Sequence, residues 1–160
     1  MDKISIVIPC FNEEEAIPVY YMEMKKIMKE MSYVGFELFF VDDGSSDRTL
    51  QELRALSDKD ERCNYLSFSR NFGKEAAIYA GLSHITGNYG VVMDVDLQDP
   101  PALLAKCMSS CKVRIGIVLL RKEAIEKESR NSVLSYLTVF IKSLIKCQRQ
   151  KLSMGQGISE

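Results

Sequence analysis

Several features that would place this 160-residue chain in other protein classes are missing from it. No run of about 18 apolar residues occurs, so no transmembrane helix is expected. The N-terminus enters a strand-like run directly and has neither the basic head nor the long apolar segment of a signal peptide. Lysine and arginine (21) nearly balance aspartate and glutamate (22), so no basic field points to nucleic acid or an anionic membrane. These absences predict a soluble cytoplasmic domain that binds no nucleic acid.

The residue sets of several common catalytic sites are also missing. The single histidine, His84, falls within an expected helix, where packing or exposure is a more ordinary role than catalysis. No serine–histidine–aspartate set, glycine-rich phosphate loop or cysteine–histidine zinc spacing is present. The five cysteines are an odd number without metal-like pairing, which fits a reducing compartment better than a disulfide framework. A triad hydrolase, a P-loop enzyme and a zinc protein are therefore not indicated.

What the sequence does contain is a regular alternation of strand-like and helix-like segments. In chain order these are strands at 4–9, 36–41, 64–68 and 90–93, separated by helices at 16–31, about 47–56 and 76–85. With 46% hydrophobic residues, the chain can bury one core, and a second full domain is not expected. Strands that alternate with helices predict an α/β fold built on a parallel sheet.

Polar side chains follow each of the four expected strands. Ligands of open parallel sheets bind beyond the carboxyl ends of the strands, so these side chains should converge on one rim. The four sets are Asn12 with Glu13, Asp42 with Asp43, Arg70 with Lys74, and Asp94 with Asp96 and Gln98. Their expected convergence is the main reason to predict a binding site.

Two of these sets have plain structural interpretations as well. Asp42 and Asp43 precede Gly44 and could form a turn with a helix cap, or they could accept hydrogen bonds from a nucleobase imide or from ribose hydroxyls. Arg70 and Lys74 could lie on a solvated loop, which is the more ordinary interpretation. If they face the aspartates instead, they would neutralise a diphosphate.

The segment 91–101 carries the most specific pattern. Its apolar run is short enough for a buried strand and ends in Asp94 and Asp96, followed by Gln98 and a Pro–Pro pair. On a continuing strand the two aspartates would point to the same side. Two carboxylates and an amide oxygen form a hard-oxygen site suited to Mg²⁺ or Mn²⁺, and such a metal would bridge the phosphates of a nucleotide.

Four ordered segments resemble glycosyltransferase family 2 at the family's spacing, over roughly residues 3–105. They are SIVIPCFNEE (5–14), VDDGSSDRT (41–49), SRNFGKEAA (69–77) and DVDLQDPP (94–101). Within the family they most resemble the bacterial prenyl-phosphate glycosyltransferases, of the bactoprenol glucosyltransferase and dolichol-phosphate mannose synthase type. The resemblance implies a GT-A, Rossmann-like mixed sheet flanked by helices and incomplete at its C-terminal side.

The resemblance also implies an activity and its residues. It implies metal-dependent, inverting transfer of a sugar from a UDP- or GDP-sugar to a polyprenyl phosphate, with Mg²⁺ or Mn²⁺ as cofactor. A saccharide acceptor, or a fragment that binds nucleotide sugars without catalysis, remains open. The implied nucleotide-sugar-binding residues are Pro9, Phe11, Asn12, Glu13, Asp42, Asp43, Arg70, Lys74 and Asp94, and the implied metal ligands are Asp94, Asp96 and Gln98. No catalytic residue is assigned, because the family's acceptor-side segments are not legible.

After Leu104 the sequence leaves the family pattern. As it stands, 113–120 predicts another strand and 133–147 an apolar helix with lysines, a candidate interfacial segment. Residues 140–160 can be back-translated into codons and read again from the third base of each codon. One consistent choice of codons then gives the peptide YKVFNKMSKTEVIDGARDFR. This peptide ends in DGARDFR, a motif of the family that the chain itself lacks. We therefore predict a donor-binding half-domain at 1–105 and an out-of-frame tail at 106–160. The full-length family form would lie at the inner face of the membrane.

Overall fold

The computed structural model describes residues 1–97, 101, 104 and 120–121. The chain divides into two compact units, 1–122 and 123–160, and all described residues belong to the first. Three sequence predictions consequently lie wholly or almost wholly outside the described residues: the role of Gln98, the strand over 113–120, of which only Leu120 is described, and the helix over 133–147. Leu120 and Arg121 form the short strand β5 (Leu120–Arg121).

The described residues form one sheet with the strand order β3-β2-β1-β4-β5. The strands of this sheet are β1 (Lys3–Cys10), β2 (Gly35–Asp42), β3 (Cys63–Ser67), β4 (Tyr89–Val92) and β5. The first four strands run parallel, and β5 pairs antiparallel with β4. The predicted α/β fold with a mixed sheet is therefore confirmed.

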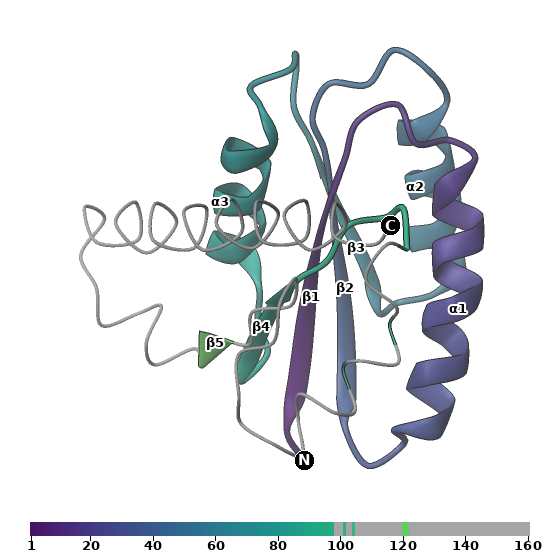
Figure 1. Ribbon diagram of the computed structural model, residues 1–160, viewed down its shortest axis with the longest axis vertical. Helices are drawn as coiled ribbons and strands as arrows, with labels where there is room; N and C mark the ends of the chain where they lie inside the picture. Colours follow the sequence, from purple (N-terminus) through teal and green to yellow (C-terminus); the bar gives the residue numbers. More distant parts are fainter. Residues whose placement is uncertain (98–100, 102–103, 105–119, 122–160) are drawn as a thin grey trace, which may run out of the picture. The chain divides into compact units, whose positions relative to one another are not determined.

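Helices cover both faces of this sheet, which explains why its central strands are almost continuously apolar. The helices α1 (Ala16–Glu30) and α2 (Thr49–Lys59) lie on one face, and α3 (Lys74–His84) lies on the other (Figure 1). Apolar residues recur at helical spacing along α1 and are buried there: Ile17, Tyr20, Tyr21, Met24, Ile27 and Met28. On the α3 face, Gly81 permits close packing, because a Cβ at this position would lie 2.3 Å from Cγ1 of Val7.

The strand order places a topological switch between β1 and β4. The chain leaves β1 toward β2 on one side, and β4 later pairs with the other side of β1. Neighbouring strands whose connections lead away in opposite directions leave a crevice at their carboxyl ends, where α/β sheets bind ligands. The polar sets that follow β1 and β4 therefore lie where the fold itself favours a site.

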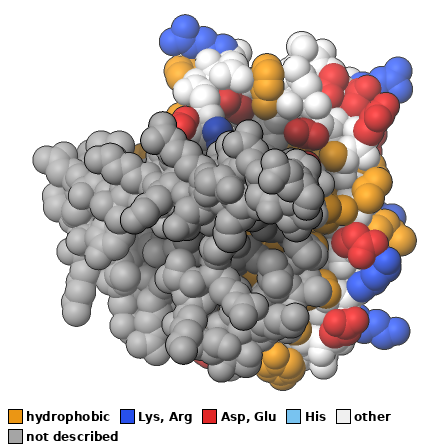
Figure 2. All heavy atoms as spheres, in the orientation of Figure 1, with side chains coloured by type: hydrophobic (Ala, Val, Ile, Leu, Met, Phe, Trp, Pro, Cys, Tyr) orange, Lys and Arg blue, Asp and Glu red, His pale blue; other side chains and the backbone are white. Residues whose placement is uncertain are grey.

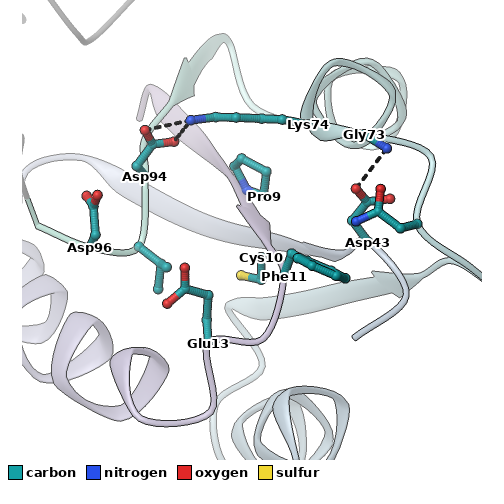
Figure 3. A pocket seen from close by; sticks show the side chains of 11 residues that line it. Pro9, Cys10, Phe11, Glu13, Asp43, Gly73, Lys74, Asp94 and Asp96 are labelled. Carbon is teal, nitrogen blue, oxygen red and sulfur yellow. Dashed lines mark hydrogen bonds and ion pairs between the residues drawn. The ribbon is translucent and has the colours of Figure 1, made fainter. Parts of the chain in front are cut away.

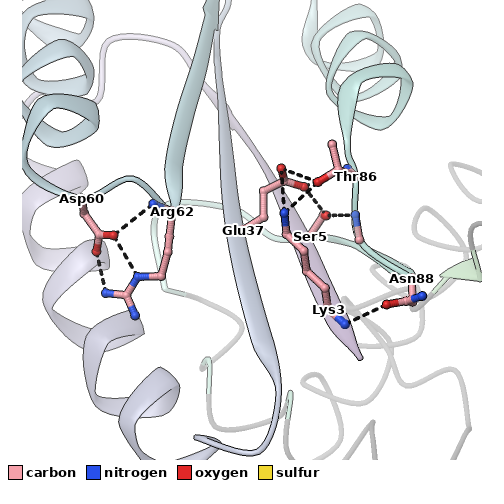
Figure 4. Close-up of polar contacts among 8 residues, drawn as sticks. Lys3, Ser5, Glu37, Asp60, Arg62, Thr86 and Asn88 are labelled. Carbon is pink, nitrogen blue, oxygen red and sulfur yellow. Dashed lines mark hydrogen bonds and ion pairs between the residues drawn. The ribbon is translucent and has the colours of Figure 1, made fainter. Parts of the chain in front are cut away.

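A buried polar network joins β1 and β2 to the segment between α3 and β4 (Figure 4). The carboxylate of Glu37, which is 5% exposed, accepts hydrogen bonds from the Ser5 hydroxyl and from the backbone N–H and hydroxyl of Thr86. The Ser5 oxygen also accepts the N–H of Gly87 at 2.8 Å, and Lys3 Nζ lies 3.4 Å from the carboxylate. Burial alone would raise the pKa of Glu37, but these donors outweigh it and hold that pKa below its usual range.

Substitution Glu37→Gln is expected to lower the free energy of unfolding by about 2 kcal/mol at pH 7, because the amide cannot accept from all of these donors. A carboxylate whose folded-state pKa is depressed stabilises the protein above its unfolded pKa of about 4.3, and this stabilisation is lost as the pH falls through the folded value. Urea unfolding at pH 7 and at lower pH should show the gap between the two proteins closing on acidification. A gap that stays constant would contradict this assignment.

The outer side of α1 carries a mixed surface. Figure 2 shows hydrophobic side chains lying among acidic and basic ones along it. Val19 and Met22 on this helix are 54% and 58% exposed. Among the residues that the structure describes, no helix is long and apolar enough to cross a membrane.

Candidate functional site

A pocket of about 400 Å³ opens at the carboxyl edge of the parallel strands, a volume typical of small-molecule sites (Figure 3). Segments that follow all four parallel strands contribute to it. The described lining residues are Pro9, Cys10, Phe11, Glu13, Asp43, Asn71, Gly73, Lys74, Asp94, Val95 and Asp96. The convergence of the strand-end sets predicted from the sequence is therefore found in the structure.

The segment after β1 supplies an aromatic ring and a carboxylate. Phe11 lines the pocket while 46% exposed, which leaves its ring accessible to a planar ligand. Burial raises the pKa of Glu13, and repulsion from Asp96, Asp47 and Asp94 raises it further. Glu13 therefore lies in a strongly negative environment, and its carboxylate points into the pocket (Figure 3).

Asn12 lies between these two residues but has a structural role. Its φ of 57° is left-handed, a conformation that asparagine tolerates better than most residues. Its Oδ1 accepts the backbone N–H of Ser46 at 2.9 Å, and its own N–H donates to the Ser45 hydroxyl. Asn12 thus ties the loop after β1 to the loop after β2, and it is not among the residues lining the pocket.

The two aspartates at the end of β2 have different roles. Asp42 is buried at 1% exposure and accepts hydrogen bonds from the Ser45 N–H and the Ser67 hydroxyl, so it organises the turn as the structural interpretation predicted. Asp43 lines the pocket, and its two oxygens accept the backbone N–H groups of Phe72 and Gly73 at 2.7 and 2.9 Å. Each carboxylate oxygen has a second lone pair, so Asp43 retains acceptor capacity toward a ligand.

The loop between β3 and α3 places its two basic residues differently. Lys74 lies in the pocket, and its Nζ is 2.7 Å from both carboxylate oxygens of Asp94. The guanidinium of Arg70 instead lies over the ring of Phe72, 4.7 Å from its centre, and Arg70 is not among the lining residues. The structure therefore brings one of these two predicted donor-binding residues into the pocket.

The aspartates after β4 reach the pocket by a turn and not along a strand. β4 ends at Val92, and residues 95–96 form a turn, followed by Leu97 with a φ of 59°. The alternation expected for a continuing strand therefore does not apply. Asp94 and Asp96 nevertheless both line the pocket because the turn keeps them at the same edge.

The charge of the pocket is its main chemical property. Among its described lining residues four are acidic (Glu13, Asp43, Asp94 and Asp96) and one, Lys74, is basic. Burial, followed by the repulsion of nearby carboxylates, raises the pKa of the Cys10 thiol, which therefore stays protonated and inert. In the part of the chain that the structure describes, no group of three or more acidic, histidine or cysteine side chains is arranged to hold a metal by itself.

The donor set nevertheless fits a metal shared with a phosphate ligand. Mg²⁺ in proteins is usually held by one or two carboxylates together with substrate phosphates and water. Asp94 and Asp96 supply two such carboxylates at one edge of the pocket.

Four lining residues are not predicted from the sequence, namely Cys10, Asn71, Gly73 and Val95. All four lie inside the segments that resemble the family, but none has a side chain that predicts ligand binding by itself. Gly73 has a φ of 96°, and this conformation sets the start of α3 and the position of Lys74. The position of Gly73 in a Gly-Lys pair immediately before a helix is the sequence feature that could have identified it.

The fold is that of an α/β protein with a parallel sheet, and the candidate ligand pocket lies at the carboxyl edge of that sheet. The sequence profile described as "Glycosyl transferase family 2" matches residues 5–159. The chain therefore belongs to glycosyltransferase family 2.

Two relatives illustrate this membership. The bactoprenol glucosyl transferase of Shigella phage SfX is 42% identical over 120 residues, which are 75% of this chain and 39% of the phage protein. The putative glycosyltransferase CsbB of Bacillus subtilis (strain 168) is 48% identical over 101 residues, 63% of this chain and 30% of that protein. The chain thus spans less than half of the length of these relatives.

Solved structures agree on the fold. The mannosyltransferase PcManGT from Pyrobaculum calidifontis, in complex with GDP-Man and Mn²⁺, superposes with a TM-score of 0.52 at 22% identity, over 59% of this chain and 28% of that one. The glucosyl-3-phosphoglycerate synthase of M. tuberculosis superposes with a TM-score of 0.50 at 26% identity, over 68% and 40% of the two chains. The described part of the chain therefore has the fold of GT-A glycosyltransferases.

Proposed function

We propose that this chain carries the donor half of a metal-dependent glycosyltransferase that transfers a sugar from a UDP- or GDP-sugar to a polyprenyl phosphate with inversion. The observation that carries the proposal is the acidic pocket at the β1–β4 switch, with Asp94 and Asp96 at one side and Lys74 between them and Asp43. The names of the phage relatives support the lipid acceptor, because they act on bactoprenol. The reaction would take place at the cytoplasmic face of a membrane.

The pocket's charge supports a metal-bound diphosphate as the ligand. Glu13, Asp94 and Asp96 would repel a diphosphate that arrives alone, whereas a divalent cation is attracted by the carboxylates and by the phosphates. Asp94 and Asp96 would hold such a cation, with Gln98 as a further proposed ligand. When bound, Mg²⁺ or Mn²⁺ supplies Lewis-acid stabilisation of the leaving nucleoside diphosphate.

The residues near β1 and β2 suit the nucleoside part of the donor. The half-exposed ring of Phe11 offers a flat apolar surface for a base, and Pro9 lies beside it in the lining. Asp43 can accept from an imide N–H or from ribose hydroxyls while it holds the loop before α3. We also propose Asn12, Asp42 and Arg70 as donor-site residues that act indirectly, by fixing the loops around the pocket.

The acceptor explains why no base is expected among these residues. A polyprenyl phosphate is already anionic, so its oxygen can attack the sugar carbon in line without losing a proton. The carbon develops positive charge while the bond to the diphosphate breaks, and inversion follows from attack on the opposite face. The chain's described residues would then need only to orient the donor and to hold its leaving group.

Calorimetry with UDP or GDP in the presence and absence of Mn²⁺ tests the donor site. The wild-type chain should bind one of these nucleotides only with the metal, and Asp94→Ala should weaken this binding by at least about tenfold, because a charge-assisted metal or phosphate contact is worth about 1.5–3 kcal/mol. Asp58→Ala, which removes an exposed carboxylate on α2, serves as control. Binding that does not depend on Mn²⁺ would contradict the proposed site.

A second candidate function is a nucleotide-sugar-binding fragment without catalysis. It is favoured by the described lining of the pocket, in which no residue is assigned to an acceptor. A transfer assay with a UDP- or GDP-sugar and a polyprenyl phosphate separates the two functions. Metal-dependent nucleotide binding without transfer supports the fragment, and transfer supports the enzyme.

We further propose that residues 1–105 are the donor-binding half-domain and that 106–160 are translated out of frame. The support is the shifted reading of 140–160, which restores a family motif from one consistent set of codons. The nucleotide sequence across codons 100–165 tests this directly. If the actual codons do not yield the shifted peptide, the tail is genuine.

A further inference from the structure

We propose that Lys74 is a resident counter-cation of the metal site, which leaves Asp94 and moves to the diphosphate when metal and donor bind together. This inference rests on the proposed function, since it concerns the same pocket. It differs from a fixed phosphate contact, because it assigns Lys74 two successive partners. Binding of the metal and binding of the nucleotide then become coupled through one side chain.

The geometry places the lysine on a carboxylate that would hold the metal. Nζ of Lys74 is 2.7 Å from Oδ1 and 2.7 Å from Oδ2 of Asp94, so it occupies the position between the two oxygens (Figure 3). A divalent ion bound to the same carboxylate would lie within a few ångströms of the ammonium group and repel it. Lys74 and a metal therefore compete for Asp94 in the absence of any other ligand.

The backbone beside Lys74 is fixed, so the exchange involves the side chain alone. Asp43 accepts the N–H groups of Phe72 and Gly73, which anchors the loop immediately before α3. The Lys74 side chain itself is 55% exposed and its partner 43%, so neither is locked by packing. A flexible four-carbon stem on a fixed backbone can swing from one anion to another within the pocket.

The charges of the pocket determine which ligands make this movement of Lys74 favourable. Metal alone would displace Lys74 into a pocket whose other acidic residues, among the described lining, are Glu13, Asp43 and Asp96. Metal with a diphosphate offers the displaced ammonium a better partner, the phosphate oxygens. The metal should therefore bind weakly alone and more tightly with a nucleoside diphosphate, and Lys74 should carry part of this cooperativity.

The test is the substitution Lys74→Met in the full chain, with two separate measurements. Mn²⁺ binding without nucleotide, followed by electron paramagnetic resonance, should become roughly threefold to fivefold tighter, the size expected for loss of an exposed competing ion pair. Binding of UDP or GDP at saturating Mn²⁺, followed by calorimetry, should become about tenfold weaker. Lys74→Arg keeps the charge and should restore most of both values.

Opposite shifts in the two affinities identify the exchange, since a merely structural lysine would not move them in opposite directions. Lys29→Met, which removes an exposed lysine at the end of α1, should change neither value. Unchanged or weaker Mn²⁺ binding by Lys74→Met overturns the inference while the proposed function stands. If the wild-type chain binds neither nucleotide with Mn²⁺, the proposed function fails, and this inference fails with it.

Discussion

Substitution Gly44→Ala is expected to lower the free energy of unfolding by at least about 3 kcal/mol. Gly44 has a φ of 71°, a left-handed conformation that costs about 1–2 kcal/mol for a residue with a Cβ. The new Cβ would also lie 2.3 Å from the carbonyl carbon of Arg70 and 2.7 Å from the backbone nitrogen of Asn71. These atoms belong to the main chain, so no side-chain rotation can relieve the contact, and overpacking adds further cost.

The same substitution should disturb the pocket, because the displaced backbone leads directly to Gly73 and Lys74. Urea unfolding monitored by circular dichroism measures the loss of stability. Gly35→Ala is the matched control, since its Cβ would meet no atom closer than 3.6 Å and its φ is not left-handed. It should cost less than about 1 kcal/mol. Similar losses for both variants would show that Gly44 has no special role.

Substitution Asp43→Ala is expected to cost about 2 kcal/mol of stability and to remove nucleotide binding. The carboxylate is 3% exposed and accepts two backbone N–H groups, those of Phe72 and Gly73. Its removal leaves both donors without their partner in a partly buried loop. The segment that carries Lys74 then loses its anchor, and the proposed base contact is lost at the same time.

Asp43→Asn separates these two effects. The amide retains one acceptor oxygen and a similar shape, so it should recover part of the stability while its NH₂ group faces one of the N–H donors. Thermal unfolding and calorimetry with UDP or GDP and Mn²⁺ measure the two consequences. Asp58→Ala, an exposed aspartate on α2, should leave both unchanged. A fully stable Asp43→Ala variant would contradict the anchoring role.

Much of the fold follows from patterns that are local in the sequence. The apolar runs and the helical spacing on α1 identify the elements, because a buried strand and an amphipathic helix each impose a short period. The alternation of these elements also predicts a parallel sheet, and hence one edge that collects the residues after each strand. Glu13, Lys74 and Asp94, which follow three of these strands, line the pocket at that edge.

Three residues predicted for the donor site do not line the pocket, because their side chains have partners elsewhere in the structure. Asn12 turns away from the pocket to accept from Ser46, and Arg70 lies on Phe72. Asp42 is buried and accepts a hydrogen bond from the Ser67 hydroxyl, whereas its neighbour Asp43 lines the pocket. No short period distinguishes such cases, since Asn12 and Asp42 depend on residues that follow or belong to another strand, and Arg70 depends on a ring two residues further along its own loop.

The segment around Asp94 illustrates what the sequence determines and what the tertiary structure determines. The sequence alone determined that two carboxylates follow a short buried strand, since residue type and spacing are enough for that inference. Only the tertiary structure decided that β4 ends before them, that a turn keeps both at the pocket, and that Lys74 from another strand's loop pairs with Asp94. The physical reason is that an ion pair across 20 residues requires the sheet to bring two strand ends together.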